Sequence, residues 1–176
     1  MIYLIGGTPR VGKSTLSSLI LERNKISILS TDTIRNLIDF APSKVGIKDL
    51  PVEEKSEAFF PYLLQLLKIL QNKYSNYVVE GDLFTPEQLS TIQEQIHFKC
   101  CFLGTSNITL EDLKKIKTEH NWISKFPEEE QEKFPKQFIQ RSEVTKTEAL
   151  KHNFPYFDIY PDRNKAIEAA YDCLFK

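Results

Sequence analysis

The sequence has little cysteine, little histidine and almost no net charge. Two of its three cysteines, Cys100 and Cys101, are adjacent, and its three histidines lie far apart. Adjacent cysteines do not make a disulfide framework, and the chain has neither C-x-x-C pairs nor histidines at ligand spacing to hold a metal. We expect buried thiols of a reducing compartment. A formal net charge of −1 argues against a strongly basic nucleic-acid module, although it does not exclude a local basic patch.

Long apolar runs and leader segments are also missing. The most apolar stretch, residues 59–70, is interrupted by Pro61 and Lys68, whereas a membrane span needs about 20 apolar residues. The first residues form a short strand-like run, and the basic residues Arg10 and Lys13 come after it, which is the reverse of the order in a signal peptide. We therefore expect a protein of the cytoplasm that does not associate with membranes.

What the chain does have is enough apolar surface for a core. Hydrophobic residues make up 41%, aromatic residues 11% and charged residues 27% of 176 residues. Disordered chains are short of aromatic residues and carry high net charge, so disorder is excluded. One domain is expected, because roughly 150 residues per domain is the usual prior.

Strand-like and helix-like segments alternate along the chain. Apolar runs predict five strands, at residues 2–5, 26–29, 77–79, 96–103 and 156–159. Helical patterns follow from residue 13, from residue 31, over 53–73, from residue 86, over roughly 110–153 and over 162–174. In the second helix, Ile34, Leu37 and Ile38 are expected to face inward. This alternation predicts an α/β fold with a mainly parallel sheet that helices cover on both faces.

One motif carries the chemistry. Residues 7–14, GTPRVGKS, match the pattern G-x-x-x-x-G-K-[ST] at every defined position, with a strand before them and a helix after them. The glycines let the backbone wrap around a phosphate, which the loop N–H groups and the positive end of the following helix attract. Lys13 supplies a cation for the phosphates, and Ser14 supplies a hydroxyl for Mg²⁺. The alternative is a glycine-rich turn that matches by chance. The residues assigned to nucleotide binding are Gly7, Arg10, Val11, Gly12, Lys13, Ser14 and Thr15.

An acid and an arginine follow the second strand. Asp32 comes directly after it, and Arg35 lies three residues further, on the same face of the predicted helix. Ligands of open parallel sheets bind at the carboxyl ends of strands. There Asp32 can accept the proton of an attacking hydroxyl, and Arg35 can hold an anionic acceptor. The alternative is that Asp32 only caps the helix and Arg35 is its solvated partner.

The segments GGTPRVGKST and STDTIR resemble the P-loop kinase superfamily of nucleotide-kinase type. They are similar to adenylate kinases, polynucleotide 5′-hydroxyl kinases and 2-phosphoglycerate kinases, over about residues 1–40, 76–104 and 135–175. The resemblance implies the P-loop NTPase fold, with five parallel strands in the order 2-3-1-4-5 and helices on both faces. We expect a single domain over residues 1–176, with a lid-like helical insertion at about residues 108–153.

Three further residues follow from the resemblance. Glu80 matches the acid that ends the third strand and steadies Mg²⁺ together with Ser14; the alternative is an acid that faces solvent. Asp82 is placed near the acceptor. Arg141, in FIQRS, matches an arginine that closes over the phosphates, although it could also be a surface residue of a helix. The catalytic set is Lys13, Asp32, Arg35 and Arg141.

The expected function is transfer of the γ-phosphoryl group of ATP, with Mg²⁺, to a small acceptor such as a nucleotide or an anionic metabolite. One alternative is a kinase for polynucleotide 5′ ends; the near-neutral charge limits such a partner to a short 5′ end. The other alternative is a regulator that binds ATP and transfers nothing. The retained Asp32 and Glu80 argue against that second alternative.

Overall fold

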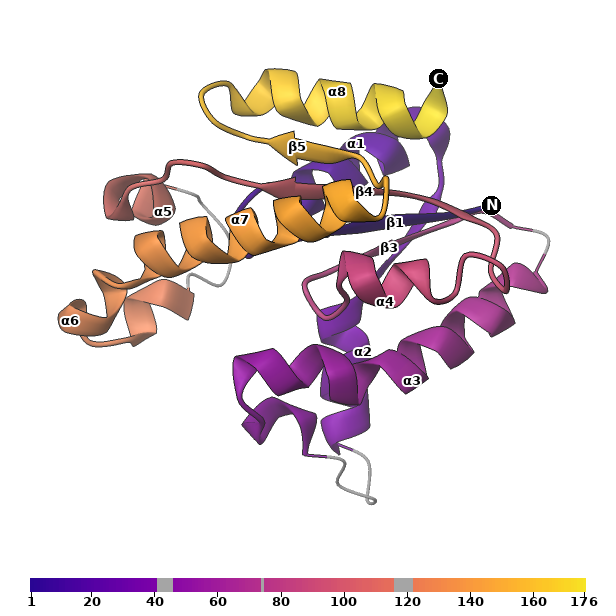
Figure 1. Cartoon of the computed structure of the whole chain (residues 1–176), viewed down its shortest axis with the longest axis horizontal. Helices are drawn as coiled ribbons and strands as arrows, with labels where there is room; N and C mark the ends of the chain where they lie inside the picture. Colours follow the sequence, from indigo (N-terminus) through magenta and orange to yellow (C-terminus); the bar gives the residue numbers. More distant parts are fainter. Residues whose placement is uncertain (41–45, 74, 116–121) are drawn as a thin grey trace.

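The structure is a computed structural model that describes residues 1–40, 46–73, 75–115 and 122–176 (Figure 1). The elements are β1 (Ile2–Gly7), α1 (Lys13–Asn24), β2 (Ser27–Ser30), α2 (Thr31–Phe40), η1 (Ile47–Asp49), α3 (Val52–Gln71), β3 (Tyr77–Glu80), α4 (Pro86–Ser90), β4 (Phe98–Gly104), α5 (Leu110–Lys115), η2 (Trp122–Lys125), α6 (Glu128–Gln131), α7 (Phe134–Lys151), β5 (Tyr156–Asp158) and α8 (Arg163–Phe175). None of the helices in these ranges is long and apolar enough to cross a membrane.

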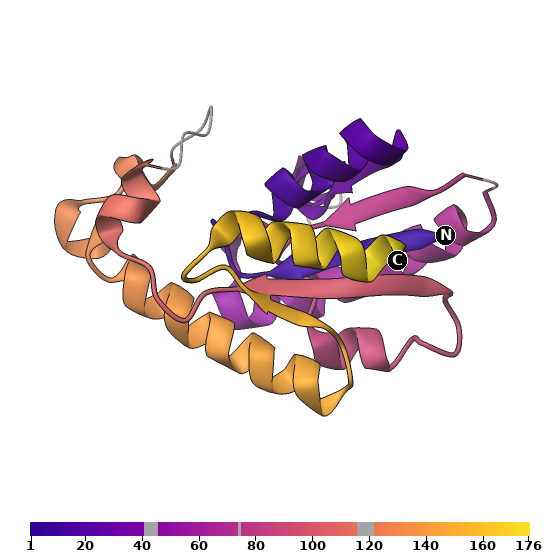
Figure 2. The same ribbon diagram turned by 90° about the horizontal axis from the view of Figure 1, so that it is seen from above.

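The sheet has five parallel strands in the order β2-β3-β1-β4-β5. The central strand β1 pairs with β3 from Ile2 to Ile5 and with β4 from Ile2 to Gly7. This confirms the expected fold class and strand order. Because all strands run in one direction, their carboxyl ends reach the same edge of the sheet, where ligands of such folds bind (Figure 2).

The strands are apolar on both faces because helices cover both. Leu4 of β1 and Phe102 of β4 belong to one apolar cluster, and the next residues along these strands, Ile5 and Leu103, belong to the other. Helices α1 and α8 cover the face of Ile5, and α3, α4 and α7 cover the face of Leu4 (Figure 1). This burial on both sides explains why the strands are continuous apolar runs without alternation.

Two expectations about side chains are wrong. Leu37 is 71% exposed, while Ile34 and Ile38 pack against the core as expected. The reason is that α2 directly follows the edge strand β2, so only one row of its side chains reaches the core. Cys100 and Cys101 are buried, but Cys173 is exposed near the end of α8.

The charged region after β4 is divided into short helices. Pro127 is the N-cap of α6, and a second proline lies in the first turn of α7, where its missing N–H costs nothing. The segment has an apolar cluster of its own, made of Ile108, Leu113, Ile123 and Phe138. Both views show α5 and α6 beyond the end of the sheet, whereas the C-terminal half of α7 lies against it (Figures 1 and 2). The lid at residues 108–153 stays a prediction.

A close approach between β3 and α2 fixes the edge that carries the acids. Thr31, the first residue of α2, is fully buried, and its side chain lies where a Cβ on Gly81 would be. The Oγ1 atom of Thr31 has no hydrogen-bond partner among the described residues. Glycine at position 81 therefore lets Asp32 and Asp82, each next to one of these two residues, come close together.

We predict that Gly81→Ala destabilises the protein by about 1–3 kcal/mol, the usual cost of overpacking a tight contact. Thr31→Ala should cost less, because it removes a buried hydroxyl that lacks a partner. In a double-mutant cycle by urea unfolding, Thr31→Ala should reduce the cost of Gly81→Ala, since the clashing Oγ1 and Cγ2 atoms are gone. Strictly additive effects would show that this contact does not limit the approach of α2.

Candidate functional site

The predicted site residues gather at the carboxyl edge of the sheet. The phosphate loop, residues 8–12, connects β1 to α1, while Asp32 follows β2 and Glu80 ends β3. Arg141 comes from α7, more than a hundred residues after the loop in the sequence. The topology brings together segments that the chain keeps far apart, and the three strands that supply them are neighbours in the sheet.

The phosphate loop has the backbone that its glycines were expected to allow. Gly7 and Gly12 have φ values of 127° and 101°, and a Cβ on Gly7 would overlap the backbone of Leu103. Arg10 also has a positive φ, 68°, which is uncommon for a residue other than glycine. Gly12 gives α1 no side-chain cap, and no acid lies in its first turn. The positive end of α1 therefore has no side-chain cap or acid of its own to neutralise it, which favours an external anion there.

Lys13 is hydrogen-bonded to the phosphate loop and interacts electrostatically with the acids. Its side chain is buried, and Nζ donates hydrogen bonds to the carbonyl oxygens of Thr8 at 2.7 Å and Gly7 at 3.1 Å. Burial lowers the pKa of Lys13, and the negative charges of Asp82, Glu80 and Asp32 act in the opposite direction. The charges of three carboxylates thus act on one ammonium group, which lies at the centre of the site. Ser14 and Thr15, by contrast, are exposed at the start of α1.

Asp32 and Arg35, which their spacing places on the same face of α2, form an ion pair. The Nη1 atom of Arg35 lies 3.0 Å from Oδ1 of Asp32. The Asp32 side chain stays 60% exposed, so its carboxylate can be reached from solvent. Partial burial nevertheless raises the pKa of Asp32, and the charge of Asp82 raises it further, against the lowering effects of Arg35 and Lys13. A carboxylate with a raised pKa is a better proton acceptor than an ordinary aspartate.

Glu80 and Asp82 lie on either side of Gly81 and differ in exposure. Glu80 is buried, which raises its pKa, while Lys13 and a hydrogen bond from Ser30 lower it. Asp82 is a quarter exposed, and its Oδ2 atom lies 4.0 Å from Nη2 of Arg141. The structure thus brings Arg141 to the acids, and its positive charge also lowers the pKa of Lys13.

The protein oxygens near the phosphate loop fit Mg²⁺, of whose ligands this chain would supply only one or two. The described residues contain no group of three acids, histidines or cysteines that could enclose a metal ion. Mg²⁺ in phosphoryl-transfer sites takes one or two protein oxygens and fills its other positions with waters and phosphate oxygens. Two protein oxygens of this kind are available. One is the exposed hydroxyl of Ser14, and the other belongs to the carboxylate of Glu80, whose pKa is raised by burial and lowered in part by the nearby charge of Lys13.

A buried hydroxyl network, which sequence analysis missed, ties α7 to the phosphate loop. Ser142 Oγ lies 2.8 Å from Thr8 Oγ1 and accepts a hydrogen bond from the Thr105 N–H at 3.0 Å. Ser142 also hydrogen-bonds to Tyr156, whose burial raises its pKa to about 12. The network holds Arg141, the neighbour of Ser142, beside the loop. Serine at position 142 carries no pattern that could have indicated this role.

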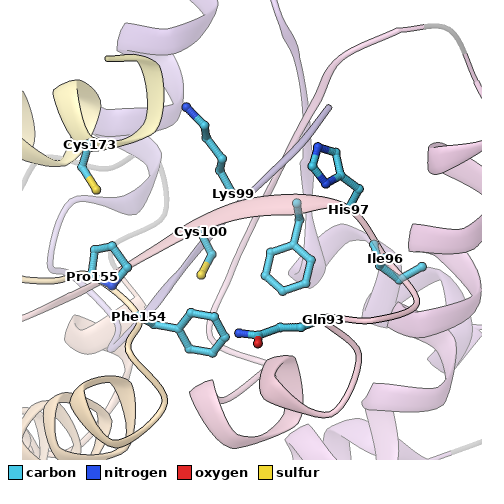
Figure 3. A pocket seen from close by; sticks show the side chains of 9 residues that line it. Gln93, Ile96, His97, Lys99, Cys100, Phe154, Pro155 and Cys173 are labelled. Carbon is cyan, nitrogen blue, oxygen red and sulfur yellow. The ribbon is translucent and has the colours of Figure 1, made fainter.

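Two cavities lie outside the phosphate loop and the acids, and the smaller of them is lined in part by Thr105 and Tyr156 of the hydroxyl network. One of about 360 Å³ is at the amino end of β4 and is lined by residues that include His97, Cys100, Phe154 and Cys173 (Figure 3). A smaller one, of about 150 Å³, lies between α7 and β5. Neither of these two cavities is lined by residues of the phosphate loop.

Comparison with known proteins finds likeness in structure alone. No model of a protein family matches the chain, and no curated protein matches it in sequence. A sugar kinase from Janibacter sp. HTCC2649 is 13% identical, with a TM-score of 0.62 over 98% of this chain and 93% of that one. Shikimate kinase from Bacteroides thetaiotaomicron is 17% identical, with a TM-score of 0.58 over 98% and 94%.

A third structure, deoxyadenosine kinase from M. mycoides with bound dATP, is 18% identical, with a TM-score of 0.54 over the whole of both chains. These proteins share the parallel five-stranded architecture that surrounds a phosphate loop. At such low identity the likeness concerns the fold. The chain has the fold of the P-loop kinases of nucleotide-kinase type, as its phosphate loop and the STDTIR segment indicated.

Proposed function

We propose that the chain transfers the γ-phosphoryl group of ATP, with Mg²⁺, to a small acceptor, either a nucleotide or an anionic metabolite. The observation that carries the proposal is the convergence on Lys13: three acids and Arg141, from three separate segments, act on one buried ammonium group at the phosphate loop. A structural lysine needs one counter-charge, whereas phosphoryl transfer needs cations for the phosphates and a carboxylate for the acceptor.

The transfer divides the work among these residues. Lys13 holds the β- and γ-phosphates, the loop N–H groups cradle the α- and β-phosphates, and Arg35 binds a negative group of the acceptor. Asp32 takes the proton of the acceptor hydroxyl as its oxygen bonds to the γ-phosphorus and the bond to ADP breaks. Arg141 neutralises charge on the transferring group. Ser14 and, through water, Glu80 would hold Mg²⁺, which neutralises phosphate oxygens when it is bound.

The segment over residues 108–153 is proposed to act as a lid in one domain with the sheet. Its small apolar cluster lets α5 and the start of α7 move as a unit, and α7 carries Arg141. Because Ser142 is bonded to Thr8, the C-terminal part of α7 would stay in place while the part around α5 and α6 moves. Closure of such a segment would exclude water from the transferring phosphoryl group.

Asp32→Asn should lower the transfer rate by roughly 10²–10⁴-fold, because asparagine keeps the size of the side chain but cannot take a proton. Arg35→Ala should mainly raise KM for an anionic acceptor. The measurement is transfer of label from radioactive ATP to nucleotides, sugar acids and short oligonucleotides, followed by steady-state kinetics on the acceptor found. Asp172→Asn, a change of the same kind on α8, is the control. Transfer by Asp32→Asn at the parent rate would reduce Asp32 to a helix cap.

Lys13→Ala should abolish transfer and weaken ATP binding by about 10-fold or more, the usual effect of losing charge-assisted hydrogen bonds. Titration calorimetry with ATP and Mg²⁺ measures the affinity, and Lys68→Ala, an exposed lysine of α3, is the control. Unchanged affinity in Lys13→Ala would contradict the assignment of the loop. Full ATP binding by the parent chain without transfer to any acceptor would favour a nucleotide-binding regulator.

The pH profile of kcat/KM offers a separate test of the acid cluster. The negative charge of Asp82 raises the pKa of Asp32, so Asp82→Asn should lower that pKa. Asp32 would then be ionised at lower pH, and the acid limb of the profile should move to lower pH. Asp82→Glu keeps the charge and should leave the limb near its original position. A limb that stays in place in Asp82→Asn would show that Asp32 is not the titrating base.

A further inference from the structure

Arg163 lies against the end of the phosphate loop and the start of α1, although it comes 148 positions after Thr15 in the sequence. It is the first residue of α8, and its Nη2 atom donates a long hydrogen bond of 3.4 Å to Oγ1 of Thr15. Its guanidinium also contacts Gly12, where a Cβ would be 3.3 Å from both Nε and Nη2. These two contacts place a cation beside the start of α1, on residues that the sequence assigned to nucleotide binding.

The charge of Arg163 has no counter-charge in the part of the chain that the structure describes. No carboxylate there lies within 4.0 Å of its guanidinium, and the only effect on its pKa is a lowering by burial. The nearby carboxylate of Asp162 instead caps α8 by accepting from the Lys165 N–H. Arg23, at the other end of the α1–α8 contact, makes a two-pronged bond with Glu168 at 2.7 and 2.8 Å.

The surroundings of Arg163 make this lack of a carboxylate costly. The guanidinium lies near the amino ends of two helices: α1 has neither a side-chain cap nor an acid in its first turn, and the carboxylate that caps α8, that of Asp162, is bonded to the Lys165 N–H rather than to Arg163. A helix has a partial positive charge at its amino end and disfavours a cation there. A half-buried guanidinium between two such ends is accounted for if an anion joins it, because arginine binds phosphate through paired N–H donors.

The position of Arg163 selects one phosphate of a nucleotide. The acids and Arg141 mark the Lys13 side of the loop, where the γ-phosphate is transferred. The loop N–H groups hold the α- and β-phosphates, so the α-phosphate lies toward the other end, beside Thr15. We propose that Arg163 binds the α-phosphate of the nucleotide held by the loop. The proposal rests on the proposed function, in that it takes the loop's ligand to be a nucleoside triphosphate.

The test measures binding in the absence of any acceptor. Arg163→Met keeps an unbranched apolar side chain and removes the charged guanidinium, and Arg23→Met makes the same change at the other end of the α1–α8 contact. Titration calorimetry should show that Arg163→Met weakens binding of ATP, ADP and tripolyphosphate by about 10-fold, and that Arg163→Lys restores part of the loss. Arg23→Met should bind all three ligands like the parent chain.

Thermal unfolding separates binding from a structural role. Without nucleotide, Arg163→Met should melt no lower than the parent chain, because a cation without a counter-charge has been removed from two helix amino ends. The rise in Tm that ATP causes should shrink in the same variant. A lower Tm without nucleotide, together with an unchanged rise with ATP, would make Arg163 structural and overturn the proposal.

The other possible outcomes of the titrations also decide whether the proposal holds. Parent-like binding of ATP and tripolyphosphate by Arg163→Met overturns the proposal while leaving the proposed function intact. Weaker binding of ATP with unchanged binding of tripolyphosphate would place Arg163 on the base or ribose and overturn the assignment to the α-phosphate. If the parent chain itself binds neither ATP nor tripolyphosphate, the proposed function fails, and this proposal fails with it.

Discussion

The rest of the site depends on the hydrogen bonds and charge interactions of the buried ammonium group of Lys13. Its hydrogen bonds to the carbonyl oxygens of Gly7 and Thr8 give the phosphate loop an internal brace. Burial of a cation is costly unless charges compensate it, and Asp32, Glu80 and Asp82 supply that compensation. The acids therefore serve two purposes: they make a buried lysine tolerable, and they surround the place where a phosphoryl group would be transferred.

Distant parts of the chain hold this arrangement through contacts that are small and buried. Thr31 lies against Gly81, which brings α2 close to the end of β3, and Ser142 links α7 to Thr8 and Thr105. Each contact positions one predicted site residue by way of its neighbour: Asp32 follows Thr31, which lies against the end of β3, and Arg141 precedes Ser142, which is bonded to Thr8 of the loop. The positions of the site residues thus depend on Thr31, Gly81 and Ser142, none of which has a role in the proposed reaction.

The sequence predicts the parts of this architecture that are local. The phosphate loop, the strand before it and the spacing of Asp32 and Arg35 depend on residues within about ten positions. The structure has the positive-φ backbone that the loop pattern indicates, and it places Arg35 beside Asp32 on one helix face. The role of Ser142, the approach of Arg163 to Thr15 and the exposure of Leu37 depend on tertiary packing. No periodicity or motif encodes such contacts, since each joins ordinary residues from distant segments or follows from a helix's place at the edge of the sheet.

The distribution of charge explains how a chain with almost no net charge can hold a highly charged ligand. On the Lys13 side, three carboxylates face Lys13, Arg35 and Arg141, so positive and negative charges are balanced where a neutral hydroxyl must meet a phosphoryl group. On the Thr15 side, no carboxylate among the described residues pairs with Arg163, and α1 begins with neither a side-chain cap nor an acid in its first turn. A ligand with its negative charge along the loop and its reacting end toward Asp32 matches this gradient, and the reverse orientation does not.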